Sequence, residues 1–88
     1  MLDQFIAFFM IHIGEEIRKE LSKQQRSAKW LAEKINCERT NIYKIFKRES
    51  LDSEQLAKIS IALNHNFFDL YDTIIDNHNN NKYNNSIQ

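Results

Sequence analysis

The feature that most constrains this chain is its lack of turn-forming residues: its 88 residues include no proline and one glycine, Gly14. Glycine and proline form most of the tight turns and bulges on which β-hairpins, sandwiches and barrels depend. A fold of helices joined by short polar connections needs few of them. A chain of this length forms one domain around a single small core. The sequence therefore predicts a single all-helical domain.

The composition excludes several classes of function. With 42% hydrophobic and 27% charged residues, the chain has the composition of a soluble globular protein. A lone cysteine excludes an intramolecular disulfide, and three widely separated histidines do not predict a metal site. The chain has no glycine-rich phosphate loop, no nucleophile–base pair and no paired carboxylates in a recognisable local motif. We expect a cytoplasmic protein that is not an enzyme and has no catalytic residues, metal or cofactor.

The charges are balanced in number but not in position. Twelve basic and twelve acidic residues give a net charge of zero. Residues 18–48 contain ten basic and three acidic residues, whereas residues 49–76 contain one basic and six acidic residues. A basic middle segment is suited to a polyanion, and an acidic remainder keeps the protein soluble. Charges that merely solvate helix surfaces would explain the same pattern equally well. The charge distribution alone therefore does not show whether the basic segment binds a polyanion.

The two ends carry little structural information. Residues 1–12 form an apolar arm that is too short to span a bilayer, which needs about 20 apolar residues. It also lacks the basic leader and cleavage site of a signal peptide. The arm is a helix that packs on the body or on a second chain, an interfacial membrane anchor, or a mis-assigned start with Met10 as the true first residue. Residues 77–88 are rich in asparagine and without periodicity, which predicts a disordered tail.

Between the ends, apolar spacing and capping residues predict five short helices. They cover about residues 14–23, 27–35 and 39–47, and two more begin near residues 52 and 66. Ser27 is a good N-cap, and Asp52 with Gln55 resembles a capping box. Asn36 tolerates the left-handed conformation that often ends a helix. No strand-like alternation of comparable length competes with these helices.

Residues 27–48 read as a helix, a short turn and a second helix. Ala32 provides the small side chain needed where two steeply crossing helices approach most closely. Cys37 lies in the turn, where an apolar residue fills the gap between the helices. Ile42 and Ile45 dock the second helix so that its N-terminal end projects outward. These are the requirements of a helix-turn-helix, in which the second helix enters the major groove of DNA.

The segment from about residue 13 to residue 75 resembles the Cro/repressor-type (XRE) helix-turn-helix family. The resemblance extends through the last two predicted helices, including the runs Ala62-Leu63-Asn64 and Phe67-Phe68-Asp69-Leu70. It implies an all-α, five-helix, lambda-repressor-like domain over residues 13–76, with its helix-turn-helix at the second and third helices. Family members bind operator DNA, usually as two-fold dimers on palindromic half-sites. The resemblance therefore implies a bacterial transcriptional regulator, and we expect a repressor.

The resemblance also assigns candidate DNA contacts. The family's base-reading positions fall on four residues of the third helix: Arg39, Thr40, Asn41 and Lys44. Arginine can form two hydrogen bonds to guanine, a pairing that contributes about 1–3 kcal/mol of discrimination. Lysine is a flexible point charge and more often contacts phosphate. The predicted phosphate contacts are Ser27, Lys29, Tyr43, Lys47 and Arg48.

Several positions leave alternatives open. Ala28 stands where the family often has glutamine, and Asn36 replaces the turn glycine. Glu38 replaces the usual Ser or Thr cap, so it either accepts a hydrogen bond from cytosine or weakens binding near phosphates. We expect Trp30 to pack between the first two helices rather than to stack on a base. Cys37 is expected to pack in the turn, although a redox role stays open.

The expected partners are double-stranded DNA and a second copy of the chain. A single DNA-binding module buries only about 600–1,000 Å² on DNA, so we expect a homodimer on half-sites about 34 Å apart. The rival hypothesis is a protein-interaction module on the same fold, such as an antitoxin that binds a toxin. The basic side chains of the third helix favour nucleic acid over that rival. The predicted dimer surface is the last helix, with some of its aromatic residues also closing the core, and consists of Phe67, Phe68, Tyr71, Ile74 and Ile75.

Overall fold

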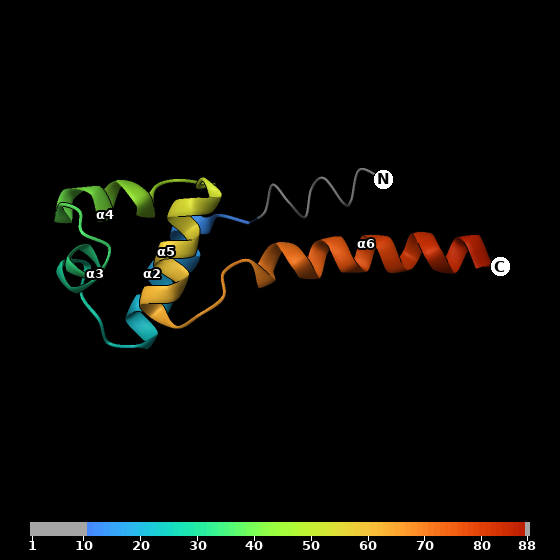
Figure 1. The fold of residues 1–88 in the computed structure, drawn as a ribbon, viewed down its shortest axis with the longest axis horizontal. Coiled ribbons are helices and arrows are strands. Elements are labelled where there is room, and N and C mark those ends of the chain that lie inside the picture. Colours follow the sequence, from blue (N-terminus) through green and yellow to red (C-terminus); the bar gives the residue numbers. More distant parts are fainter. Residues whose placement is uncertain (1–10, 88) are drawn as a thin grey trace.

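The computed structural model describes residues 11–87, with side chains placed for residues 11–79. This part of the chain contains five helices and no strand, which confirms the predicted all-helical class (Figure 1). The predicted arm lies outside the described residues except for Ile11 and His12. The helices are α2 (Ile13–Lys23), α3 (Ala28–Lys34), α4 (Arg39–Phe46), α5 (Ser53–Leu63) and α6 (Asp69–Ile87).

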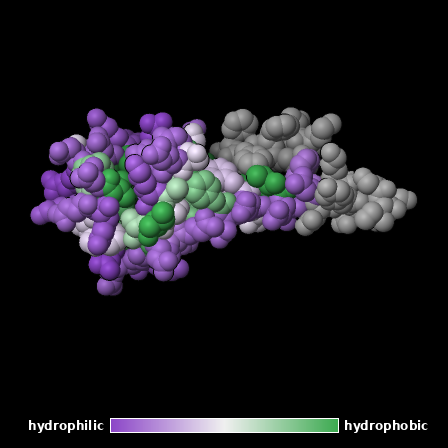
Figure 2. Space-filling view, viewed as in Figure 1, coloured by the Kyte–Doolittle hydropathy of each residue, from purple (hydrophilic) through white to green (hydrophobic). Residues whose placement is uncertain are grey.

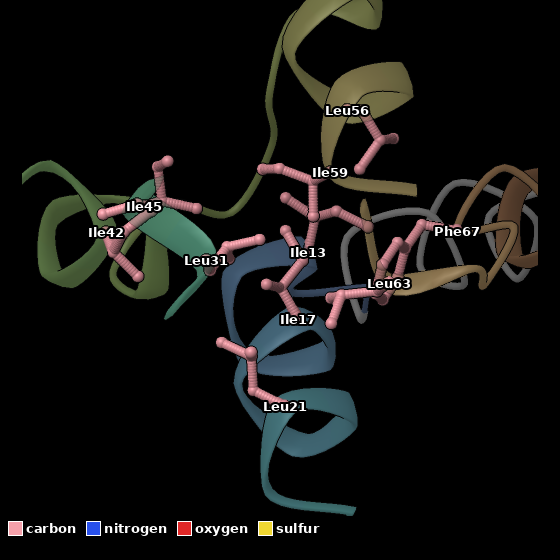
Figure 3. Packing of buried hydrophobic residues seen from close by; sticks show 11 residues of the cluster. Ile13, Ile17, Leu21, Leu31, Ile42, Ile45, Leu56, Ile59, Leu63 and Phe67 are labelled. Atoms are coloured by element: carbon pink, nitrogen blue, oxygen red, sulfur yellow. The ribbon is translucent and has the colours of Figure 1, made fainter. Parts of the chain in front are cut away.

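One apolar core holds the first four of these helices together. α2 and α5 run through the middle of the body, α3 and α4 lie at one side, and α6 projects from the other (Figure 1). Side chains from α2, α5 and the segment before α6 converge at the centre (Figure 3). Burying a large aliphatic side chain contributes about 1.5–3 kcal/mol, so this cluster supplies most of the driving force. Its members are Ile13, Ile17, Leu21, Leu31, Ala32, Ile42, Ile45, Leu56, Ile59, Leu63 and Phe67.

The start of α2 is anchored to the segment that follows α4. The backbone N–H of Ile13 donates to the carbonyl of Glu49 (3.0 Å), and that of Gly14 donates to the carbonyl of Arg48 (2.9 Å). These bonds satisfy donors that a helix start leaves unpaired. A Cβ atom on Gly14 would lie 2.5 Å from the backbone carbonyl oxygen of Phe46 and even closer to the carbonyl oxygen of Ile45. The one glycine of the chain is therefore required by a close approach of helices rather than by a turn.

The predicted caps are present. The Ser27 hydroxyl accepts from the backbone N–H of Trp30 (3.0 Å), and the Asp52 carboxylate accepts from that of Gln55 (2.7 Å). Asn36 has a φ of 59°, the left-handed conformation expected after α3. Each N-cap bond of this kind contributes about 0.5–2 kcal/mol. Local sequence signals thus place both ends of α3 and the start of α5 correctly.

The C-terminal ends of α2 and α5 are joined by a side-chain hydrogen bond that the sequence did not predict. The amide of Gln24 donates to the carboxylate of Glu20 and to the carbonyl of Leu63, both at 2.8 Å. Gln25 and Asn64, which follow these two helices, are both left-handed, with φ of 57° and 49°. The chain therefore reverses direction at both places without glycine.

Helix α6 differs from the prediction at both ends. It was expected to start at Asn66, but residues 66–68 form a turn in which the Asn66 side chain accepts from the N–H of Phe68 (3.1 Å), and the helix starts at Asp69. The sequence predicts disorder from residue 77, whereas α6 continues to Ile87. Extending an existing helix needs no new nucleation, so a polar run can remain helical without the apolar face on which the prediction relied.

Candidate nucleic-acid interface

Helices α3 and α4 pack closely and are joined by residues 35–38. Leu31 of α3 lies beside Ile42 and Ile45 of α4, and all three side chains are at most 3% exposed (Figure 3). Ala32 is equally buried, and its carbonyl accepts from the backbone N–H of Cys37 (2.9 Å). The three apolar contacts and this hydrogen bond fix the position of α4 relative to α3.

Cys37 packs in the connection between the two helices. Its side chain is half-buried, and its Sγ contacts the backbone carbonyl of Glu38 at 3.5 Å. Burial, and to a lesser extent the Glu38 carboxylate, raises the pKa of the Cys37 thiol. The basic residues nearby do not lower this pKa, so the thiolate needed for redox reactivity is disfavoured. The environment supports a packing role.

The outer half of α4 is polar and exposed. The helix turns about 100° per residue, so the side chains opposite Ile42 and Ile45 share one side of the helix. Thr40 and Lys44 lie there, and Arg39 and Asn41 flank this side of the helix; all four are exposed. The four side chains thus cover the outer side and both flanks of α4, on surface that the core does not use.

The predicted phosphate contacts flank this surface. Lys47 and Arg48 follow α4 and are exposed, although the Arg48 guanidinium donates to the carbonyl of Ser50 (3.3 Å). Tyr43 is 50% exposed, and its ring meets that of Phe46 edge-on, with centroids 5.8 Å apart. Tyr43 therefore covers part of the helix surface and keeps half of its own surface accessible.

The start of α3 contributes the remaining predicted contacts. The Ser27 hydroxyl is occupied as a cap, and Lys29 is exposed. Trp30 is half-buried and packs against the core. The guanidinium of Arg26 lies 4.5 Å from the Trp30 ring centroid, and the ammonium of Lys34 lies 5.7 Å from it. Such cation–π contacts hold basic groups beside α3 at low entropic cost.

The electrostatics of the helix starts distinguish α3 and α4 from the other helices. The first turns of α2, α5 and α6 each contain an acidic residue, whereas those of α3 and α4 contain none. Glu38 is the N-cap residue of α4, but its side chain makes no capping hydrogen bond. The positive end of the α4 dipole is therefore neither neutralised by its first turn nor capped by a side chain.

The structure changes the set of residues that can form the predicted dimer surface. Phe67 is 1% exposed and belongs to the core, so it cannot contribute to an interface and is removed from that prediction. Phe68, Tyr71 and Ile74 are half-buried, and Ile75 is 44% exposed. Burial also raises the pKa of the Tyr71 hydroxyl, so it stays neutral at physiological pH. The four remaining residues stay available for contacts.

The comparisons with known proteins leave this interface to be judged on its own geometry. No family model matches the chain, and neither curated proteins nor solved structures show significant similarity to it. Across residues 11–87, no helix combines the length and apolar character needed to cross a membrane.

Proposed function

We propose that this chain is a sequence-specific DNA-binding regulator of the XRE type, with a lambda-repressor-like fold in which α3 and α4 form the helix-turn-helix. Helix α4 enters the major groove, where its first side chains reach base edges. One observation carries the proposal: Arg39, Thr40, Asn41 and Lys44 of α4 are all exposed, while Ile42 and Ile45 of the same helix are buried in the core. Such a protein acts in the bacterial cytoplasm as a transcriptional regulator, and we expect repression.

The electrostatics of the same region support this function. Residues 18–48 carry a net charge of +7, and Lys29, Lys47 and Arg48 are exposed around the outer half of α4. Each phosphate that a basic side chain neutralises steepens the dependence of log K on log salt by about 0.9. We therefore expect binding to weaken steeply as salt increases.

The proposal includes a homodimer on a palindromic operator. One module of this size buries too little surface on DNA for tight specific binding. Two copies would place their α4 helices in successive major grooves, on half-sites about 34 Å apart. The operator would then carry the two-fold symmetry of the protein.

The rival function is protein recognition by the same surface, as in an antitoxin. Interaction surfaces are usually centred on large apolar or aromatic anchors. The outer half of α4 offers only Tyr43 in this role, and that ring is partly engaged with Phe46. The two functions also coincide when an antitoxin represses its own operon.

The test is a fluorescence anisotropy titration of the chain on its own upstream DNA and on scrambled DNA of equal length, at several salt concentrations. The variants are Arg39→Ala and Lys47→Ala. The matched control is Arg18→Ala, which removes the same charge from a side chain that is paired with Glu15 on α2. Each variant is titrated on both DNAs.

Each variant has a distinct expected result. Arg39→Ala abolishes the preference for upstream DNA, a loss of about 1–3 kcal/mol. Lys47→Ala weakens binding to both DNAs alike and reduces the salt slope by about 1. Arg18→Ala leaves the sequence preference unchanged. Absence of binding to either DNA at low salt would contradict the proposal and direct the search to a protein partner.

A further inference from the structure

A second exposed surface is centred on α5 and is apolar rather than basic. Ile61 is 81% exposed, more than any other large hydrophobic residue in the described part of the chain. Single exposed aliphatic residues are common and need no explanation. Ile61 is not isolated, however, because an open hollow lies on each side of it. The surface around it therefore has the shape of a docking site.

The two hollows extend this surface along the molecule. One lies between α3 and α5, where Ile35 and Ala62 meet Ile61. The other lies between α5 and the start of α6, where Phe68 meets Ile61. Figure 2 shows patches of apolar surface along this face, from the α3–α4 end of the body to the first turns of α6. We call Ile35, Ile61, Ala62 and Phe68 the apolar strip.

The rim of the apolar strip is basic on the α3 side. Lys34 and Lys58 line the same hollow as Ile35, and no acidic residue lines it. Lys58 is within 3.5 Å of the Glu54 carboxylate, an exposed pair of the kind that contributes little and is readily exchanged. An occupant of this hollow should therefore combine apolar side chains with carboxylates.

Helix α6 has that combination. Its first two turns carry Leu70, Tyr71, Ile74 and Ile75 beside three exposed aspartates, and its first basic residue is Lys82. The helix projects away from the body, so it does not cover the apolar strip of its own chain (Figure 1). The aspartates that carry its charge are Asp69, Asp72 and Asp76.

We propose that α6 of each chain lies across α5 and α3 of a second copy, with Ile74 and Ile75 against Ile61 and the aspartates near Lys34 and Lys58. Because each copy has both the strip and the helix, a two-fold axis forms both contacts at once and closes the assembly at two chains. The inference rests on the proposed function in that it assigns the surface of the expected dimer. Dimerisation is measured without DNA, and DNA binding is measured by anisotropy. A failure of the proposed dimer contact can therefore be told apart from a failure of the proposed DNA binding.

The first experiment measures the mass of the full chain and of Ile61→Ser by sedimentation equilibrium in the absence of DNA. The matched control is Tyr43→Ser, which removes another exposed hydrophobic side chain, on α4. The full chain should dimerise, and Ile61→Ser should raise the dimer Kd about 100-fold or more, because each dimer loses two buried isoleucines. Tyr43→Ser should leave the Kd unchanged.

The second experiment reverses the charges of the two surfaces separately. The double variant Lys34→Glu/Lys58→Glu makes the rim acidic, and Asp72→Lys/Asp76→Lys makes α6 basic. Each variant alone should dimerise weakly, since like charges then face each other. An equimolar mixture should recover dimers, because both interfaces of the mixed dimer pair opposite charges. The control Lys19→Glu/Lys23→Glu changes charge by the same amount on α2 and should have no effect.

Three outcomes would overturn the proposal. One is a full chain that remains monomeric at the highest concentration reached. Another is a dimer that Ile61→Ser leaves intact, which would assign dimerisation to another segment such as residues 1–10. The last is a mixture that fails to recover dimers although circular dichroism shows both charge variants to be helical. If the charge variants lose helicity, the comparison of Ile61→Ser with Tyr43→Ser decides.

Discussion

Helices α4 and α5 are alike on their inner sides and opposite on their outer sides. Both bury isoleucines in the same core, Ile42 and Ile45 on α4 and Ile59 on α5. Outside, α4 exposes a row of polar and basic side chains, whereas α5 exposes Ile61. The inner side places a helix in the fold, and the outer side determines which partner it recognises. This difference is the basis of our proposals that α4 binds a polyanion and that α5 binds an apolar surface.

The two helices also differ where they begin. Helix α5 starts with Asp52, whose carboxylate caps the first turn, while α4 starts with Glu38, which makes no capping bond. The uncapped start of α4 leaves backbone donors accessible at the end that we propose meets DNA. The side-chain cap therefore stabilises the start of α5, and the start of α4 lacks this contribution.

The largest expected change in stability concerns the buried isoleucines on the inner sides of α4 and α5. Ile42→Ala and Ile59→Ala should each lower the free energy of unfolding by about 2–5 kcal/mol, because both leave a cavity in the core. Urea denaturation followed by circular dichroism measures this loss. Ile61→Ala is the control and, at protein concentrations below the dimer Kd, should change stability by no more than about 0.5 kcal/mol. Equal losses for Ile59→Ala and Ile61→Ala would break the distinction between inner and outer sides of α5.

The next effect concerns the support of α4 by α2. Gly14→Ala should destabilise the protein by about 1–3 kcal/mol, because the added methyl group meets backbone carbonyls that cannot rotate away. Thermal unfolding measures the change against Ser22→Ala, an exposed position on the same helix. Alanine is the better helix former at both positions. A Gly14→Ala variant that is stabilised would show that α2 and α4 are not held in close approach.

A smaller effect sharpens the contrast between the helix starts. Asp52→Ala should cost about 0.5–2 kcal/mol of stability, because the cap of α5 is lost. Glu38→Ala should be nearly neutral, and Glu38→Ser should be stabilising because serine can cap α4. Denaturation midpoints at constant m-value measure all three. A loss for Glu38→Ala as large as that for Asp52→Ala would contradict the uncapped start.

The smallest effect is chemical and concerns the connection before α4. Because burial raises the pKa of the Cys37 thiol, alkylation by iodoacetamide at neutral pH should be slower in the folded chain than in the urea-unfolded chain. The fold favours the protonated thiol, so this contribution to stability is full below the unfolded pKa and is lost as pH rises through the folded pKa. Alkylation rates measured across alkaline pH test whether the pKa of the Cys37 thiol is higher in the folded chain than in the unfolded chain. Faster alkylation of the folded chain would restore a reactive role for Cys37.

Much of the fold was predictable from local patterns. The intervals of apolar residues located the helices, and Ser27, Asp52 and Asn36 marked their ends, because such signals act within one turn of chain. The exposure of Thr40 and Lys44 on α4 followed from the inward direction of Ile42 and Ile45, whereas only the structure showed that Arg39 and Asn41 are also exposed. The sequence predicted that some aromatic residues near α6 close the core but did not single out Phe67, since apolar spacing does not tell a core residue from an interface residue.

The helical class, the position of most helices and the polar side of α4 follow from local sequence, because helical periodicity and capping depend on residues three or four apart. That Gly14 marks a close helix approach and that Ile61 remains exposed could be learned only from the packed fold. The packed fold also shows that α6 leaves the body and continues to Ile87 (Figure 1). Those properties depend on how segments far apart in the chain are placed against one another, and no local pattern encodes that placement.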